Sequence, residues 1–380
     1  MTEIHGHCDE AFASVREQFA RHFDEGQELG ASVCVTKDGE TVVDLWGGDA
    51  DTAGRPWEQD TICNVWSTTK TMSAIVLLML ADRGEIDLDS PVATYWPEFA
   101  ANGKERVLVR HVLAHTAGLP GFAPAVGLDV LLDQDLAAEN LGAQAPWWEP
   151  GTKSGYHLIT QGYLEAEIVR RVTGRTIGTF FREEVSGPLG AEFWIGLPES
   201  EESKVAELIP PDLTELVGMA TSAADSVAGR ATLSAAITGA EPNERAWRAA
   251  EIPAAGGTAN ARGVARVHAA LANGGTLDGV ELLSQKTIDR IYDEQIEMVD
   301  LVLGVKMRLG IGFGLMNDTI PLSPNPRSCF WGGWGGSICV IDVDAQISVA
   351  YVMNKMAGGL VGDLRGAMVA LAAIGVATAG

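Results

Sequence analysis

A serine and a lysine three residues apart, Ser67 and Lys70, open a strongly apolar stretch of the sequence. The pattern predicts a helix over residues 67–83, and positions 74–81 are apolar on every side, which is typical of a buried helix. Residues three apart on a helix share one face, so the amine can reach the hydroxyl and assist it as a nucleophile. The first turn of a helix also favours a developing oxyanion. The pair is compatible with a catalytic serine, but short motifs of this kind also occur by chance, and an N-cap role for Ser67 explains the same residues.

Composition and charge narrow the class of protein. With 380 residues, the chain is long enough for one large domain or two smaller ones. Its formal charge of −24 argues against a nucleic acid or an anionic membrane as partner. The apolar run at 74–81 is also far shorter than the roughly 20 residues of a membrane-spanning helix.

The cysteines and the N-terminus bear on the compartment. Five cysteines, with no CxxC pair, predict reduced thiols in a cytoplasmic protein. No basic region followed by an apolar run opens the chain, so a secretory signal is not expected. His5, His7 and Cys8 would need a further ligand to hold a metal, and a frayed terminus is the favoured interpretation. Neither a metal nor an organic cofactor is expected.

The elements that must position Ser67 come from both ends of the chain. Residues 31–36 and 41–46 predict two strands joined by an Asp-Gly turn, which is a strong hairpin signal. Residues 330–342 and 346–354 are again rich in β-forming side chains, whereas the section between the two β-rich ends is mainly helical. We predict an α/β fold of the α+β type, with one central antiparallel sheet built from both chain ends and flanked by helices.

The mainly helical section is predicted to be an insertion between the two parts of the chain that form the sheet. The expected sheet domain consists of residues 1–62 and 254–380, and the mainly helical domain of residues 63–253, with the active site at their junction. Residues 198–250 are compatible with a place at the substrate entrance, which the sequence itself does not show.

Two further side chains could take part in proton transfer. His115 precedes a Gly/Pro loop and could be a general base, although a hydrogen-bonded loop anchor is the commoner role for such a residue. Tyr156 follows a Pro-Gly turn, where a tyrosine usually serves packing. The glycines of 331–336 indicate either a close approach to the backbone or a bulged edge strand. Residues 310–315 lack GxGxxG, so a dinucleotide site is not expected.

Taken together, these stretches resemble the serine β-lactamase and penicillin-binding-protein-like hydrolases, and most of all the family VIII carboxylesterases. The Ser-x-x-Lys motif of that superfamily matches Ser67 and Lys70. Its tyrosine motif matches Tyr156 after the turn at 150–152, and its Lys-Thr-Gly strand corresponds to Trp331-Gly332-Gly333. The chain also lacks Gly-x-Ser-x-Gly, which disfavours an α/β-hydrolase.

The resemblance implies roles for these residues. Ser67 would attack an ester carbonyl, and either Lys70 or Tyr156, with the pKa of Tyr156 lowered by Lys70, would take the proton. The backbone N–H groups of Ser67 and Trp334 would form the oxyanion hole. The substrate pocket would be lined by side chains and backbone from both domains, at Trp331, Gly332, Gly333, Trp334, Trp148 and His157.

Two departures from the lactamase motifs bear on the substrate. Lactamases have Tyr-x-Asn, but this chain has Leu158 in the place of the asparagine. The basic residue of Lys-Thr-Gly is replaced by Trp331. Because a site that lacks a polar partner discriminates against the polar ligand, both changes favour neutral, short-chain carboxylic esters over charged β-lactams.

Other functions remain open on sequence grounds. A β-lactamase or D-alanyl-peptide hydrolase would use the same residues, as would an amidase acting on small or cyclic amides. A non-catalytic binding module on the same fold is a further alternative, which the intact Ser67, Lys70 and Tyr156 argue against. The expected partner is a small-molecule ester, and both a monomer and a homo-oligomer are compatible with the sequence.

Overall fold

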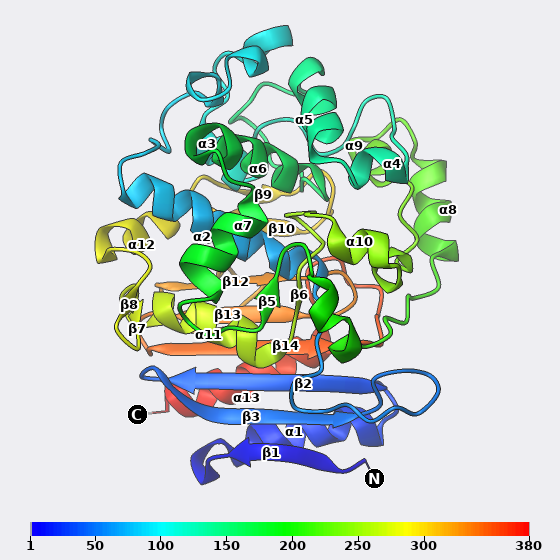
Figure 1. Cartoon of the computed structure of the whole chain (residues 1–380), viewed down its shortest axis with the longest axis vertical. Helices are drawn as coiled ribbons and strands as arrows, with labels where there is room; N and C mark the ends of the chain where they lie inside the picture. The colour runs from blue at the N-terminus through cyan, green and yellow to red at the C-terminus, as the bar shows by residue number, and fades with distance from the viewer. Residues whose placement is uncertain (1, 380) are drawn as a thin grey trace.

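The computed structural model describes residues 2–379, apart from the side chains of residues 215 and 216. Its largest element is a nine-stranded antiparallel sheet with the strand order β1-β3-β2-β14-β13-β12-β11-β10-β9 (Figure 1). The strands are β1 (Ile4–Cys8), β2 (Gly30–Lys37), β3 (Glu40–Gly48), β9 (Ile296–Val299), β10 (Lys306–Leu309), β11 (Gly314–Leu315), β12 (Ser328–Gly332), β13 (Ile338–Asp342) and β14 (Ile347–Met353).

The two ends of the chain meet in the middle of this sheet. The hairpin of β2 and β3 turns at Asp38 and Gly39, whose φ angles of 53° and 84° are those that a two-residue hairpin turn requires. β14 then pairs with β2, with Tyr351 opposite Val33. The predicted antiparallel sheet built from both chain ends is confirmed. The domain boundaries at 62/63 and 253/254 stay a prediction.

Helices cover both faces of the sheet. On one face, α1 (Ala13–Asp24) and α13 (Leu364–Ala377) pack together, with α13 against β14 and α1 against β3, and on the other face α11 (Ala261–Ala272) packs against β2, β13 and β14 (Figure 1). Every residue of β14 is consequently buried, without the alternation of a half-exposed strand. Instead of a frayed terminus, residues 4–8 form β1, which pairs with β3 and places His5 opposite Trp46. That sequence interpretation is wrong, because the edge of β3 offers main-chain partners that the local sequence does not reveal.

The helix predicted over 67–83 begins as a 3-10 turn at Trp66–Thr68 and continues as α2 (Thr69–Asp82). All of α2 up to residue 80 is buried, and it runs between the sheet and the remaining helices (Figure 1). Those helices are α3 (Val109–Leu113), α4 (Leu128–Leu131), α5 (Gln134–Ala143), α6 (Thr160–Thr173), α7 (Ile177–Phe181), α8 (Thr214–Ser222), α9 (Val227–Thr232), α10 (Arg245–Ala249) and α12 (Gln285–Ile291).

Short strands complete the structure. A three-stranded sheet consists of β4 (Cys63–Asn64), β6 (Thr258–Ala259) and β5 (Phe193–Trp194), and a hairpin of β7 (Thr276–Leu277) and β8 (Val280–Glu281). The strand β4 leads directly into the turn before α2, so the small sheet fixes the point at which the chain enters that helix. None of the helices in residues 2–379 combines the length and the apolar character that a bilayer crossing requires.

Candidate active site

Ser67 lies in a turn whose backbone is held from several sides. Trp66 has a φ of 45°, a left-handed conformation that is rare for a bulky residue and needs support from its surroundings. The Trp66 N–H donates to the side-chain oxygen of Asn64 at 3.0 Å. From the sheet, the hydroxyl of Ser337 donates to the Val65 carbonyl at 2.8 Å. The position of Ser67 is therefore set by the fold as well as by the start of α2.

The amine of Lys70 is directed at Ser67 by two backbone carbonyls. Its Nζ lies 3.1 Å from the Ser67 Oγ, 2.7 Å from the Leu158 oxygen and 3.0 Å from the Ala254 oxygen. The two carbonyls accept two N–H groups, so the remaining tetrahedral position of the nitrogen faces the serine. In the neutral amine that position holds the lone pair, which is the geometry that a general base for Ser67 requires.

Burial makes this amine a usable base near neutral pH. Lys70 is 1% exposed, and burial lowers the pKa of its amine from 10.5 to about 7, with the nearby Glu165 opposing the change. Glu165 lies on α6, is itself fully buried, and neither of its carboxyl oxygens has a hydrogen-bond partner. Burial raises the pKa of Glu165 well above its usual value, which favours a neutral carboxyl beside a neutral amine. Sequence reasoning missed Glu165.

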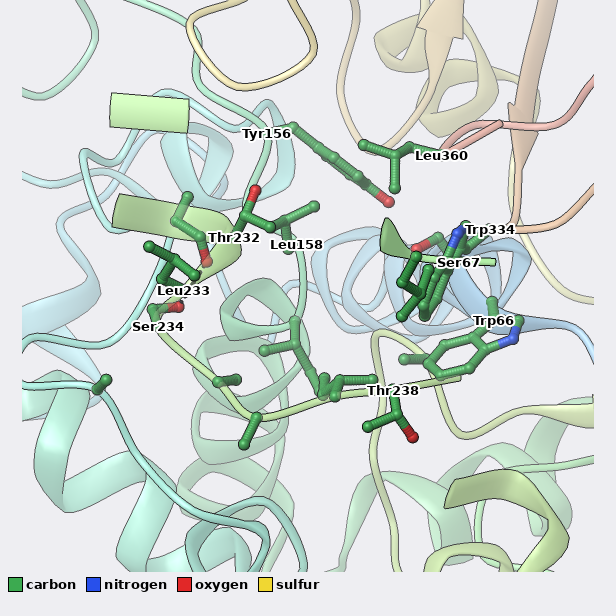
Figure 2. A pocket seen from close by; sticks show the side chains of 18 of the residues that line it. Trp66, Ser67, Tyr156, Leu158, Thr232, Leu233, Ser234, Thr238, Trp334 and Leu360 are labelled. Atoms are coloured by element: carbon green, nitrogen blue, oxygen red, sulfur yellow. Dashed lines mark hydrogen bonds between the residues drawn. The ribbon is translucent and has the colours of Figure 1, made fainter. Parts of the chain in front are cut away.

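Tyr156 completes the cluster. Its ring centroid lies 4.8 Å from the Lys70 Nζ, and its hydroxyl points toward Ser67 (Figure 2). Burial raises the pKa of Tyr156 above its usual 10.0, and its interactions with Ser67 and Trp331 oppose the change only in part. The expected lowering of that pKa by Lys70 is wrong, because a buried phenolate loses more hydration than the neighbouring groups restore. The phenol therefore keeps its proton at neutral pH.

The loop between β12 and β13 faces Ser67. Among the hydrogen bonds of residues 2–379, none is donated by the backbone N–H of Ser67 or of Trp334. Gly332 and Gly333 explain how the loop approaches so closely. A Cβ on Gly333 would lie 2.2 Å from the Val65 oxygen, and one on Gly332 would lie 2.4 Å from the backbone nitrogen of Gly362. Of the two interpretations of these glycines, the structure favours close approach to the backbone, with protein segments as the neighbours.

A cavity of about 460 Å³ opens over Ser67 and Tyr156 (Figure 2). Its walls come from the start of α2, from the loop that holds Trp334, and from residues 231–238, and none of the side chains that line it is charged. The sequence is compatible with a place for residues 198–250 at the substrate entrance, and the structure puts part of them on the wall of this cavity. The lining residues are Trp66, Ser67, Ala125, Val126, Tyr156, Leu158, Ile159, Leu213, Val217, Ala231, Thr232, Leu233, Ser234, Ala235, Ala236, Ile237, Thr238, Ala255, Trp334 and Leu360.

Five of the residues expected at the substrate, namely Trp331, Gly332, Gly333, Trp148 and His157, do not line this cavity. The ring of Trp331 stacks on His115 at 5.2 Å and lies 5.6 Å from Tyr156. Trp148 packs edge-on against His157, and His157 accepts a hydrogen bond from the Leu119 N–H at 3.1 Å. The structure thus brings together Ser67, Lys70, Tyr156 and Trp334, whereas Trp331 packs against the ring of Tyr156 and Trp148 packs against His157.

His115 is held as an anchor. Its Nδ1 accepts a hydrogen bond from the His157 N–H at 3.2 Å, and its ring lies edge-on to Tyr156 at 4.9 Å. Burial lowers the pKa of His115 well below its usual value, so the ring is neutral. Within residues 2–379, no group of three or more His, Cys, Asp or Glu side chains is placed to hold a metal ion.

Together, the fold and this site define a class of protein. A serine and a lysine at the start of a buried helix, facing a loop at one end of an antiparallel sheet, are the arrangement of a β-lactamase-like serine hydrolase. The profile of the Beta-lactamase family matches residues 16–373. The chain belongs to the Beta-lactamase family.

Individual relatives agree with that assignment. The chain is 37% identical over 372 residues to the esterase/beta-lactamase LipL of Mycobacterium tuberculosis, covering 94% of this chain and 84% of LipL. The structure is similar to that of a family VIII carboxylesterase, with a TM-score of 0.88, 42% identity, and coverage of 98% of this chain and 100% of the other. It is also similar to a penicillin-binding protein homologue from Caulobacter crescentus, with a TM-score of 0.88, 39% identity, and coverage of 99% and 100%. The resemblance seen in the sequence is confirmed.

Proposed function

We propose that this chain is a carboxylesterase that hydrolyses neutral, short-chain carboxylic esters through an acyl-enzyme on Ser67. The observation that carries the proposal is the cavity over Ser67, which is lined without a single charged side chain. An anionic substrate would lose its hydration there and find no cation in return, whereas a neutral apolar ester gains from burial. The similarity to a family VIII carboxylesterase, at 42% identity, supports the same substrate class.

The first half of the reaction forms the acyl-enzyme. The Ser67 Oγ attacks the ester carbonyl carbon while its proton passes to the neutral amine of Lys70, 3.1 Å away. The negative charge that develops on the carbonyl oxygen is stabilised by the backbone N–H groups of Ser67 and Trp334, a kind of donor worth roughly 10²–10³ in rate. When the tetrahedral intermediate collapses, the alcohol oxygen takes the phenol proton of Tyr156, which Lys70 then replaces.

The second half releases the acid. A water molecule takes the place of the alcohol and gives a proton to the neutral Lys70 as its oxygen attacks the acyl carbon. The bond to the Ser67 Oγ then breaks, and the serine oxygen recovers its proton through Tyr156 and Lys70. In each half of the reaction Lys70 accepts one proton and gives one up. The enzyme therefore ends in its starting state.

The expected pH dependence of kcat/KM follows from the protonation of Lys70. Because Lys70 must be neutral to accept the serine proton, and its pKa is about 7, we expect kcat/KM to fall below pH 7 by about tenfold per pH unit. A profile with p-nitrophenyl butyrate from about pH 5 to about pH 9 measures this, and a rate that stays level down to about pH 5 would exclude Lys70 as the base.

A substrate panel tests the proposed function itself. The panel compares kcat/KM for p-nitrophenyl butyrate with kcat/KM for a lactone, an anilide and the anionic lactam nitrocefin. We expect kcat/KM for the ester to exceed that for nitrocefin by about 10²-fold or more, because the cavity holds no partner for the lactam carboxylate. Mass spectrometry of the trapped enzyme should show a butyryl adduct on the peptide that contains Ser67. Comparable ester and lactam rates would favour a β-lactamase.

The compartment is part of the proposal. All five cysteines are free, and Cys34, Cys63, Cys329 and Cys339 are buried. Free buried thiols are usual in a reducing compartment, which supports the cytoplasm. The oligomeric state stays a prediction.

A further inference from the structure

A buried aspartate far along the chain holds the segment that carries Tyr156. Asp300 lies in the turn between β9 and β10, and its Oδ1 accepts a hydrogen bond from the backbone N–H of Tyr156 at 3.0 Å. Its Oδ2 accepts a hydrogen bond from the hydroxyl of Ser154. The next residue, Leu301, donates its N–H to the Ser154 carbonyl at 2.9 Å. The β9–β10 turn is therefore hydrogen-bonded to both neighbours of Gly155, namely Ser154 and Tyr156.

The carboxylate of Asp300 is itself rigid. Its Oδ1 also accepts the backbone N–H groups of Val302 and Leu303, both at 2.9 Å, and the residue is 2% exposed. No ion pair to Asp300 occurs among residues 2–379, so these donors alone satisfy its charge. A carboxylate fixed by its own turn is a firm anchor for a second segment, because charge-assisted hydrogen bonds are short and strong.

The hydrogen bond to Asp300 fixes the backbone of Tyr156, the residue whose side chain must be placed accurately for proton transfer. The backbone of Tyr156 leads to a phenol whose hydroxyl points toward Ser67 (Figure 2) and which, in the proposed mechanism, must also reach the leaving oxygen. The ring packs against His115 at 4.9 Å and Trp331 at 5.6 Å between ring centroids, so the hydrogen bond to Asp300 holds the backbone end of a side chain whose ring is already enclosed. The negative charge of Asp300 also helps to keep the pKa of the phenol high, and so keeps its proton available.

We propose that Asp300 is a positioning residue that places the Tyr156 hydroxyl where it protonates the alcohol leaving group. The proposal rests on the proposed esterase function. It assigns a role to the β9–β10 turn, which contributes no side chain to the cavity. A displacement of about 1 Å of a proton donor can cost up to about 10²-fold in rate, so loss of the anchor should be visible in catalysis.

Two esters with different leaving groups can distinguish a positioning role of Asp300 from a merely structural one. p-Nitrophenolate is a stable anion and departs without a proton, whereas an alkoxide departs only if it is protonated. Ethyl butyrate and p-nitrophenyl butyrate share one acyl group and differ in this respect. Their kcat/KM values report the acylation half of the reaction, in which the alcohol leaves.

We expect Asp300→Ala to lower kcat/KM for ethyl butyrate by about 10–10²-fold and that for p-nitrophenyl butyrate by less than about threefold. Tyr156→Phe should show the same preference, with a larger loss on the ethyl ester. Asp300→Asn keeps an oxygen that accepts the Tyr156 N–H and an amide that donates to Ser154, so it should restore the ethyl ester rate to within about threefold. Should Asp300→Ala fail to fold, Ser154→Ala removes one hydrogen bond to the same carboxylate. It should shift the ratio of the two kcat/KM values in the same direction.

Asp342 offers a matched control. It is fully buried, and its carboxylate accepts hydrogen bonds from the Ala345 N–H at 2.8 Å and from Ser323 and Asn325. Asp342→Ala should lower the melting temperature without changing the ratio of the two ester rates. Equal losses on both esters in Asp300→Ala, or none, would overturn the positioning role. A wild-type chain that turns over neither ester and forms no Ser67 adduct would instead overturn the proposed function, and this proposal with it.

Discussion

Replacing Ser67 with alanine should abolish ester hydrolysis in a protein that remains folded. We expect kcat for p-nitrophenyl butyrate to fall by roughly 10⁵–10⁶-fold, as happens when a serine hydrolase loses its nucleophile. The neighbouring hydroxyl of Thr68 cannot substitute, since Thr68 is fully buried and its hydroxyl is hydrogen-bonded to that of Ser337 at 3.0 Å. Steady-state rates, together with the absence of an acyl adduct by mass spectrometry, measure the effect.

The control for Ser67→Ala lies on the same helix. Ser73 is buried on α2 and donates its hydroxyl to the Pro253 carbonyl, but it does not line the cavity. Ser73→Ala therefore removes a serine hydroxyl and one internal hydrogen bond without touching the reacting atoms. It should retain the wild-type rate. Full activity in a folded Ser67→Ala variant would refute Ser67 as the nucleophile, and with it the proposed mechanism.

Replacing Lys70 should cost nearly as much. We expect Lys70→Ala to lose about 10³–10⁴-fold in kcat/KM, because the base is removed and the carbonyls of Leu158 and Ala254 lose their donor. Lys70→Arg is the more informative change. A guanidinium keeps the positive charge and the donors but stays protonated at any working pH, so it cannot accept the serine proton. Rates for both variants, measured with p-nitrophenyl butyrate at pH 8, carry the test.

The two substitutions at Lys70 separate two explanations of its role. If Lys70 serves as a base, the arginine variant should be about as inactive as the alanine variant. If it serves only as a cation, arginine should recover most of the rate. Lys104 is the matched control, since it is another fully buried lysine, with its Nζ hydrogen-bonded to the Ala101 and Gln144 carbonyls. Lys104→Met should reduce stability and leave kcat/KM unchanged.

Lys70 and Glu165 are both buried, and burial shifts the pKa of each group toward its neutral form. Two buried groups that each disfavour their charged form can both rest neutral, which avoids the cost of an unpaired charge in the interior. The proton taken from Ser67 then creates a positive charge on Lys70 beside a carboxyl. In the proposed mechanism that charge is transient, because the proton passes on through Tyr156 to the leaving alcohol.

Much of this protein follows from local sequence. Ser67 and Lys70 meet because three residues span nearly one helical turn, a relation that no tertiary contact is needed to establish. The hairpin at residues 38–39 follows from the backbone freedom of Asp-Gly, and the β-rich ends of the chain require each other as partners. The motif around Tyr156 was recognised from its order along the chain.

Tertiary structure alone decided how the site works. The pKa of Tyr156 rises because segments distant in sequence exclude water from it, and no local pattern records that exclusion. The same is true of Glu165, which periodicity could have flagged only as an acidic residue on the buried face of α6. Trp331 faces His115 instead of the substrate, and residues 231–238 close the cavity, because packing sets side-chain direction. Helix geometry brings Ser67 and Lys70 together, whereas burial by the folded chain lowers the pKa of Lys70 to about 7, which the proposed mechanism requires.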